Sequence, residues 1–536
     1  MMKKRIFSML VIAIVLITLI AIAGLSPATA QDKNDAATLR RELEELKREH
    51  SARIEKLEER LRELESEAAT IGSGEEEAKS IAVEALKKAE ENQAAAAKSG
   101  DTHHKVVFPP PETYPSYLTR GFEFHGYLRS GYGINGNGGR QVYFKAPGAG
   151  AKYRLGNETE TYGELALVNN FIAKPDNPFW KIQIRASVWS PENKNDDETD
   201  SDGHFKLGLR ETFIEAGNFD WSPTMKFWAG NRFYRRHDIH IIDFYWLDMS
   251  GYGGGVEDIP LFGDTKLAIA YLGGSIDDYE FPDVGRVAKN TADIRLYDIP
   301  LPLGTGMICV APSTLKGGNY TEDGVEHNYP SSSGYGLTAA HKHNLSDGGY
   351  NEVTVQYGHG TGSQFTPTIQ DPTPDLRETW TFRATETFLI NSWESFALMA
   401  TTLFQMESNG GPDDNKITWY SIGARPIYNF TEHLGLALEA GLDYVKNETL
   451  PDAEGNPAKG VLGKITLAPE LRINAEFLGR PVLRLYFTYA AWSKDFKGYV
   501  GGLDDMSPGD NPYENDTQGC AVGIQGEAWW EGGGSA

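Results

Sequence analysis

The sequence contains little that would support a disulfide-stapled domain or a nucleic-acid-binding protein. Among its 536 residues there are only two cysteines, Cys309 and Cys520. Two are too few for a disulfide framework, although a single bridge between them stays open. Lysine and arginine number 51 against 75 aspartates and glutamates, which gives a formal net charge of −24. Because nucleic acids are bound by basic faces, this balance argues against such a partner.

Motifs for catalysis are also missing from the chain. There is no Ser-His-Asp order, no phosphate-binding loop and no isolated pair of carboxylates. Carboxylate pairs suited to glycoside hydrolysis can be drawn in any acidic chain, so they do not by themselves indicate an enzyme. His237 and His240 lie close together in the sequence, but no third convincing ligand accompanies them. We therefore expect no catalytic residues, no metal and no other cofactor.

Long hydrophobic runs are confined to the first segment of the chain. Residues 1–30 combine basic residues, an apolar run and a small-residue ending at Ala30, which predicts a secretory signal peptide. A retained membrane anchor is the alternative. No later stretch reaches 18 consecutive apolar residues. A mature protein that crosses a membrane would therefore have to do so as a closed β-barrel.

Residues 31–100 have the pattern of α-helices. Between residues 36 and 71, apolar residues recur at steps of three and four among charged residues, which predicts a coiled coil and self-association. A four-residue step after His50 interrupts the heptads without breaking the helix, and a single solvated helix is the alternative. Residues 101–121, which include VVFPPPETYPSY, form a proline-rich linker.

From residue 122 onward the hydrophobic pattern changes to a period of two. Alternating runs such as FWKIQIRASVW, KLAIAYLGG and VLRLYFTYAAW are separated by Gly, Asn, Asp and Pro, and the last run ends in Trp529 and Trp530. The polar faces of these runs carry charges and glycines that are too hydrophilic for a packed core. We therefore predict an all-β fold, an antiparallel transmembrane β-barrel, with a soluble β-sandwich as the alternative.

Three aromatic residues alternate onto the polar faces of these strands. In FEFHGYLRSGYG, Tyr127 falls with Arg129 on the charged face, and the phenylalanines fall on the other. In KYRLGNETETYGELAL, taken as one strand, Tyr162 falls with the charges and Leu155 with the apolar face; in the last strand, Trp529 falls on the polar face. Sugars offer an apolar ring face to aromatics and hydroxyls to charged groups. These faces therefore predict a sugar path inside a barrel.

The stretch at residues 228–258 is the densest in charged and aromatic residues. It begins as a strand and ceases to alternate after Phe233. Such a segment is too apolar to extend into solvent, so we predict that it folds into the pore and narrows it.

These segments resemble the maltoporin family of sugar-specific outer-membrane porins. The resemblance covers residues 122–530 and is carried, in the same order along the chain, by FHGYLRSG, KYRLGNETETYGELAL, WAGNRFYRRHDIHIIDFYW, KITLA and the terminal aromatic pair. It implies an 18-stranded antiparallel barrel, a homotrimer in outer-membrane lipid, and passive diffusion of maltose and maltodextrins. It also implies a periplasmic N-terminal extension, whose coiled coil would meet a cell-wall or periplasmic partner.

The resemblance also implies two sets of solute-contacting residues. The aromatic slide corresponds to Tyr127, Tyr162 and Trp529, with Phe365 as a further candidate and Leu478 where a slide tryptophan is expected. The polar track and constriction correspond to Arg129, Arg154, Glu164, Arg210, Arg236, His240, Asp243, Tyr245 and Asp248. Leu478 is an even number of positions from Arg480 and Arg484. On a strand it would share their face, so we predict that Leu478 faces the lumen. For the aromatic that a neighbouring subunit would lend, Phe205 is the nearest equivalent.

The chain departs from the family pattern in its cysteines and its end. Tyr143 and Thr159 replace the cysteine pair of some members, and the tail at residues 531–536, EGGGSA, follows the terminal aromatic.

Two further functions remain as alternatives. The coiled coil resembles that of sucrose porins, whereas Arg236, Tyr245 and Asp248 resemble maltoporins at the constriction, where solute is desolvated. Maltodextrin is therefore favoured, with sucrose or another oligosaccharide as the alternative. An alternative of another class is a structural tether between outer membrane and cell wall, in which the barrel is only an anchor.

Overall fold

The computed structural model describes residues 121–533, except 159, 173–177, 191–205, 282–284, 323–324, 346–347, 369–375, 394, 411–414, 453–454 and 503–510. The expected signal peptide, the coiled coil, nearly all of the linker, Phe205 and Thr159 lie outside the described residues. Among the described residues, no helix is long and apolar enough to cross a membrane.

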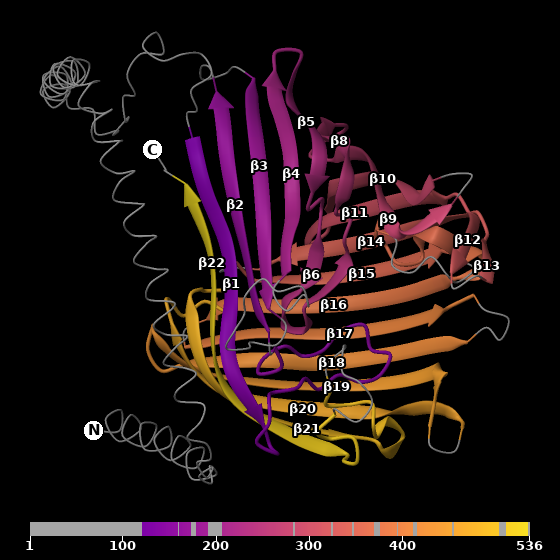
Figure 1. The fold of residues 1–536 in the computed structure, drawn as a ribbon. Helices are drawn as coiled ribbons and strands as arrows, with labels where there is room; N and C mark the ends of the chain where they lie inside the picture. Colours follow the sequence, from indigo (N-terminus) through magenta and orange to yellow (C-terminus); the bar gives the residue numbers. More distant parts are fainter. Residues whose placement is uncertain are drawn as a thin grey trace, which may run out of the picture. The chain divides into compact units, whose positions relative to one another are not determined.

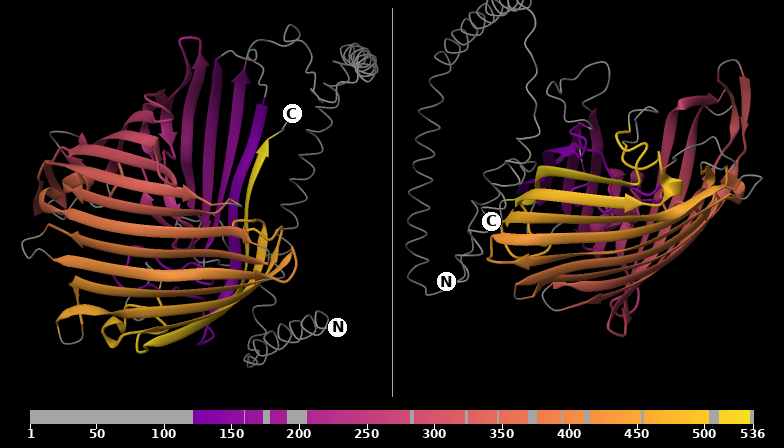
Figure 2. Two further views of the ribbon diagram at one scale, coloured as in Figure 1. Left: turned by 180° about the vertical axis from the view of Figure 1, so that it is seen from behind. Right: turned by 90° about the horizontal axis from the view of Figure 1, so that it is seen from below.

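Eighteen strands of the described chain form one closed antiparallel barrel (Figure 1). They are β1 (Gly121–Asn135), β2 (Thr161–Ile172), β3 (Phe179–Ser190), β4 (Lys206–Phe219), β5 (Ser222–Arg232), β8 (Gly251–Pro260), β9 (Lys266–Phe281), β10 (Gly285–Leu301), β11 (Gly304–Leu315), β14 (Ser332–Asn344), β15 (Tyr350–His359), β16 (Trp380–Trp393), β17 (Phe396–Ser408), β18 (Lys416–Asn429), β19 (Leu434–Pro451), β20 (Pro457–Arg472), β21 (Val482–Trp492) and β22 (Gln518–Gly533). Closure comes from β1, which pairs with β2 on one side and with β22 on the other (Figures 1 and 2). The predicted 18-stranded antiparallel barrel is confirmed.

The outer and inner faces of the wall follow the alternation of the sequence. On β1, Phe122 is 58% exposed and Leu128 is 45% exposed, whereas Arg129, on the other face, is only 5% exposed. Ile524 on β22 is likewise exposed, and Glu527 is buried. Alternate residues of a strand point to opposite faces of the sheet, so one face meets lipid and the other the lumen. The predicted facing of these strands is confirmed.

The longest connections between strands all lie at one edge of the barrel. β10 ends at Leu301 and β11 begins at Gly304, whereas residues 136–160 join β1 to β2 and residues 233–250 join β5 to β8. The first described residue, Gly121, lies at the edge with the short turns, because β1 runs from it toward the long connection.

Three of the long connections pack against the inner wall. The connection at 136–160 has no strand; that at 233–250 contains β6 (His237–Ile239), the 3-10 helix η2 (His240–Ile242) and β7 (Phe244–Leu247); that at 360–379 contains η4 (Gly360–Gly362) and η5 (Leu376–Glu378). Between β11 and β14, the strands β12 (Gly318–Glu322) and β13 (Val325–Tyr329) form a separate hairpin. The prediction that the stretch after Phe233 folds inward is confirmed by the burial of its isoleucines.

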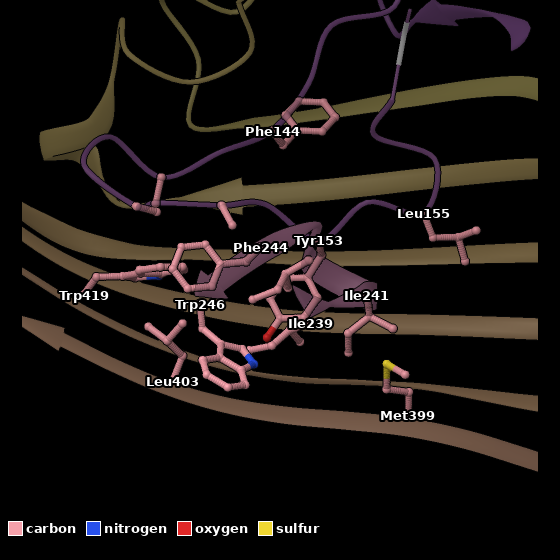
Figure 3. Close-up of a cluster of buried hydrophobic side chains, with 14 of the residues drawn as sticks. Phe144, Tyr153, Leu155, Ile239, Ile241, Phe244, Trp246, Met399, Leu403 and Trp419 are labelled. Carbon is pink, nitrogen blue, oxygen red and sulfur yellow. The ribbon is translucent and has the colours of Figure 1, made fainter. Parts of the chain in front are cut away.

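A hydrophobic cluster joins these connections to the wall (Figure 3). Tyr153, Ile241 and Trp246 from the connections pack with Met399 and Trp419 from the strands, and all five are buried. Burial of this much apolar surface stabilises the inward folding of both connections. The inner face of β16 to β20 is thereby covered, and the more exposed inner residues belong to β22 and β1 to β5.

The inward folding corrects one prediction. Residues 152–158 are part of the connection at 136–160 and not of a strand, because β2 begins only at Thr161. Leu155, predicted to face outward, is 2% exposed, and its backbone N–H donates to Glu439 Oε1 at 3.0 Å. The alternation in this stretch is a local pattern that packing inside the barrel overrides.

Candidate functional site

Three aromatic rings lie side by side on the inner wall. The ring of Tyr127 on β1 lies between Tyr162 on β2, with centroids 6.0 Å apart, and Trp529 on β22, with centroids 6.5 Å apart and planes 19° apart. β1 pairs with both neighbours, and Tyr127 is directly opposite Trp529 in the register. The structure thus brings together the three main slide residues, while their binding of solute stays a prediction.

The hydroxyl of Tyr127 is fully used in hydrogen bonds to charged groups. It accepts from Arg129 Nη1 at 3.1 Å and from Arg154 Nη2 at 3.0 Å, and it donates to Glu527 Oε1 at 3.1 Å. A phenol hydroxyl has one proton and two lone pairs, so these three bonds satisfy it. The ring is therefore held in place by its edge.

Glu527 is the centre of this charged network. Its carboxylate accepts from Arg154 at 3.0 Å, from Arg480 at 2.8 Å and from Arg484 at 2.8 Å, and the residue is 3% exposed. Arg480 also lies over the Trp529 ring, 4.3 Å from its centroid. The row of rings formed by Tyr162, Tyr127 and Trp529 is called the aromatic run below. Charge-assisted bonds of this kind are short and directional, so they hold the polar groups beside this run in place. The sequence prediction left Glu527 and Arg480 out of the site, although alternation already placed Glu527 on the face of Trp529.

His240 on η2 joins the inward loop to this network. Its ring nitrogens lie 3.3 Å from Arg154 Nη1 and 3.3 Å from Arg480 Nη2. Its ring meets Trp529 edge-on, with centroids 5.7 Å apart. Burial and the two guanidiniums hold the pKa of His240 well below its ordinary value. The imidazole therefore stays neutral at physiological pH.

Glu164 closes the other end of the aromatic run. It accepts a hydrogen bond from the Tyr162 hydroxyl and another from Arg185 Nη1 at 3.2 Å. Arg185 in turn donates to Glu211 at 2.5 Å. Arg185 was also absent from the predicted site. It lies four residues from Lys181 on β3, so alternation alone would have put both side chains on the inner face.

A stack of guanidiniums and aromatic rings forms where the loop at 233–250 leaves β5. Arg236 lies 3.7 Å from the centroid of Phe233 and 4.6 Å from that of Tyr245, so it is held between two rings. Arg210 on β4 lies 5.6 Å from the Phe233 centroid. The predicted residues Arg210, Arg236 and Tyr245 are thus brought together, and Phe233 is the member that the sequence prediction missed.

Two aspartates of the same loop were also predicted to line the constriction, and this role stays a prediction. Asp243 is exposed and follows η2 with a left-handed φ of 51°, and Asp248 accepts from the backbone N–H of Ser250 at 2.9 Å. Burial, together with nearby carboxylates that include Asp243 and Asp248, raises the pKa of Tyr245 to about 12. Its hydroxyl is therefore a neutral hydrogen-bond group in the channel.

Two further predicted slide residues lie in connections and not on strands. Phe365 is 2% exposed and packs under Arg383, whose guanidinium is 4.9 Å from the ring centroid, so it offers no ring face to the lumen. Leu478 lies in the connection at 473–481 between β20 and β21. The alternation with Arg484 does not apply to it, because β21 begins only at Val482, and Leu478 instead packs half-buried against the inner hydrophobic cluster.

The two cysteines are not bonded to each other. Both Cys309 and Cys520 are free thiols, and Cys309 is buried with its Sγ 3.3 Å from Asp293 Oδ2. The single bridge that the sequence left open is not present.

The chain is similar to one family model and to several solved structures. A family model described as LamB porin matches residues 122–530. Among solved structures, the chain is similar to the outer membrane protein OprD from Pseudomonas aeruginosa, with 7% identity over 78% of this chain and 96% of that chain and a TM-score of 0.38. It is also similar to OccAB1 from Acinetobacter baumannii, with 8% identity over 76% of this chain and 96% of that chain and a TM-score of 0.41.

Proposed function

Because this chain belongs to the LamB porin family and forms a closed barrel, it is an outer-membrane channel rather than an enzyme, and we propose that it conducts maltose and maltodextrins. Transport would be passive diffusion along the inner wall of β22, β1 and β2.

The observation that carries this proposal is the unbroken run of Tyr162, Tyr127 and Trp529. The rings are 6.0 Å and 6.5 Å apart and come from three adjacent strands. A glucose unit has apolar C–H faces that pack on aromatic rings, and a chain of such units can step from ring to ring without leaving apolar contact. An isolated ring would support only lumen filling.

Charged groups beside the rings are suited to the hydroxyls of the same sugar. Glu164 adjoins Tyr162, while Arg129 and Arg154 adjoin Tyr127. Carboxylates accept and guanidiniums donate, so a sugar hydroxyl could exchange with the bonds that these buried groups now make to one another. Each site must bind weakly, near the millimolar regime of about −4 kcal/mol, so that the solute leaves again.

We further propose that the N-terminal extension lies in the periplasm. Outer-membrane barrels have short periplasmic turns and longer extracellular loops. β1 starts at Gly121 at the edge with the short turns, so residues before 121 would leave the barrel on the periplasmic side. A homotrimer and a coiled coil at residues 31–100 belong to the same proposal.

Ion current through single channels tests the proposal directly. Maltose and maltotriose added to a planar bilayer should reduce the current in a saturable way, with tighter block by the longer sugar. Stronger block by sucrose than by maltose would replace the maltodextrin proposal with the sucrose alternative. A current that no sugar reduces would contradict a sugar channel altogether.

A further inference from the structure

One wall of the channel carries two arginines without a described ion-pair partner, although the charge of Arg236 also acts on the exposed carboxyl of Asp238. Arg210 on β4 is exposed and Arg236 is half-buried, and neither forms an ion pair with any residue that the structure describes. Both guanidiniums lie on the ring of Phe233, at 5.6 Å and 3.7 Å from its centroid. Stacking on an aromatic face holds a guanidinium in place and leaves its N–H edge free for a planar acceptor.

The carboxylates of the same wall are already bound. Glu211 is 3% exposed and accepts from Arg185 at 2.5 Å and from Gln183 at 2.6 Å. Glu215 is also buried and pairs with Arg232 at 3.2 Å. Beside Phe233, channel water therefore meets Arg210, Arg236 and the exposed carboxylate of Asp238, whereas Glu211 and Glu215 are buried.

The cationic wall extends along β3 and β4. Lys181 lies over the Phe213 ring at 5.2 Å and pairs with Glu215 at 3.6 Å, and Lys206 lies over the Trp189 ring at 4.9 Å. On β3, Lys181, Arg185 and Trp189 share the inner face. Residues four apart on a strand are about 13 Å apart, so cations recur along most of the strand.

We propose that this wall binds carboxylated oligosaccharides as a solute class beyond neutral maltodextrins. The inference rests on the proposed sugar path, because the rings of Tyr127 and Tyr162 would hold the sugar backbone. Arg210 and Arg236 would receive a sugar carboxylate edge to edge, the geometry in which guanidinium bonds are strongest. The exposed carboxylate of Asp243 on the same loop would oppose an anion placed beside it. The site is therefore suited to a uronate whose carboxylate lies beside Phe233.

Block of single-channel current by two sugars of equal length tests the inference. We expect tetragalacturonate to block at a lower concentration than maltotetraose. Arg210→Gln should raise the half-blocking concentration of the uronate about tenfold and that of maltotetraose less than threefold, because only the uronate loses a charge-assisted contact. Arg210→Lys, which keeps the charge, should recover part of the uronate block.

Lys342 on β14 supplies the matched control. It is an inner-wall cation over an aromatic ring, 4.2 Å from the centroid of Tyr350, outside the proposed site. Lys342→Gln should leave the ratio of the two half-blocking concentrations unchanged, and a shift equal to that of Arg210→Gln would overturn the inference.

The remaining outcomes separate the two proposals. Block by maltotetraose alone, or an equal effect of Arg210→Gln on both sugars, would overturn the inference and leave the proposed function standing. Block by the uronate alone would support the inference and contradict the maltodextrin proposal. Failure of both sugars to block would contradict both.

Discussion

The hydroxyl of Tyr153 lies 3.0 Å from Oγ of Ser421, which ties the first long connection to the barrel wall. The ring lies across Gly423 and Gly441, which face each other directly in the register of β18 and β19. The next residue, Arg154, reaches the Tyr127 hydroxyl at 3.0 Å. The contact of Tyr153 with the wall therefore also positions a polar partner of the aromatic run.

Gly423→Ala should displace the connection at 136–160. A Cβ at this position would overlap the ring of Tyr153, and overpacking of this kind costs about 1–3 kcal/mol. We expect noisier and altered single-channel conductance, with weaker block by maltotriose because Arg154 moves with Tyr153. Gly463→Ala on β20 is the control, since its Cβ would meet the nearest side-chain atom at 3.6 Å. Identical currents in both variants would show that the ring does not position the loop.

Glu527→Gln should weaken the barrel strongly. The change leaves Arg154, Arg480 and Arg484 without their shared anion in a buried place, and breaking one partner of a buried ion pair costs about 3–5 kcal/mol. Urea unfolding measures the loss. Glu123→Gln removes an exposed carboxylate from the inner face of β1 and should change the free energy of unfolding far less. A similar loss in the two variants would contradict the central role of Glu527.

Tyr127→Ala should raise the half-blocking concentration of maltotriose about tenfold, because one ring contact of about 1 kcal/mol and the ordering of its neighbours are lost. Tyr127→Phe keeps the ring but loses the hydrogen bonds to Arg129, Arg154 and Glu527. The phenylalanine variant should therefore retain more block than alanine. Unchanged block in Tyr127→Ala would reduce Tyr127 to a residue that only fills the lumen.

His237 should make stability depend on pH. The ring stacks on Trp246 with centroids 4.6 Å apart, and burial with the nearby Arg295 and Arg235 lowers its pKa to about 3. In the unfolded chain the pKa is about 6.5. Below that pH the unfolded state takes up a proton that the folded state does not, so stability is lost as pH falls from about 6.5 toward 3.

Relative to pH 7.5, the free energy of unfolding at pH 5 should be lower by about 2 kcal/mol because of His237. Urea unfolding at pH 7.5 and pH 5 should show that His237→Gln removes this part of the pH dependence. His433→Gln, in the exposed turn between β18 and β19, is the matched control and should leave it in place. An equal pH dependence in wild type and His237→Gln would contradict the assignment.

Local periodicity was sufficient for residues on regular strands. Tyr127, Tyr162 and Trp529 were placed on the inner face because a strand turns alternate residues to opposite sides, whatever the rest of the chain does. The same reasoning was wrong for Leu155 and did not apply to Leu478, because both lie in connections where no such rule holds. Alternation also could not show whether Phe365 offers its ring to the lumen, because packing of its connection against the wall buries the ring.

Composition and alternation alone were thus enough to predict an acidic, all-β protein with aromatic rings on its charged faces, and they favoured a barrel over a β-sandwich. Only the tertiary structure decided which groups meet inside it. Arg154, Arg480 and Arg484 converge on Glu527, and the sequence holds no local signal for contacts between residues so far apart. Closure of the sheet and inward folding of the connections bring them together, because burial of Tyr153, Ile241 and Trp246 against the wall favours one arrangement of the loops.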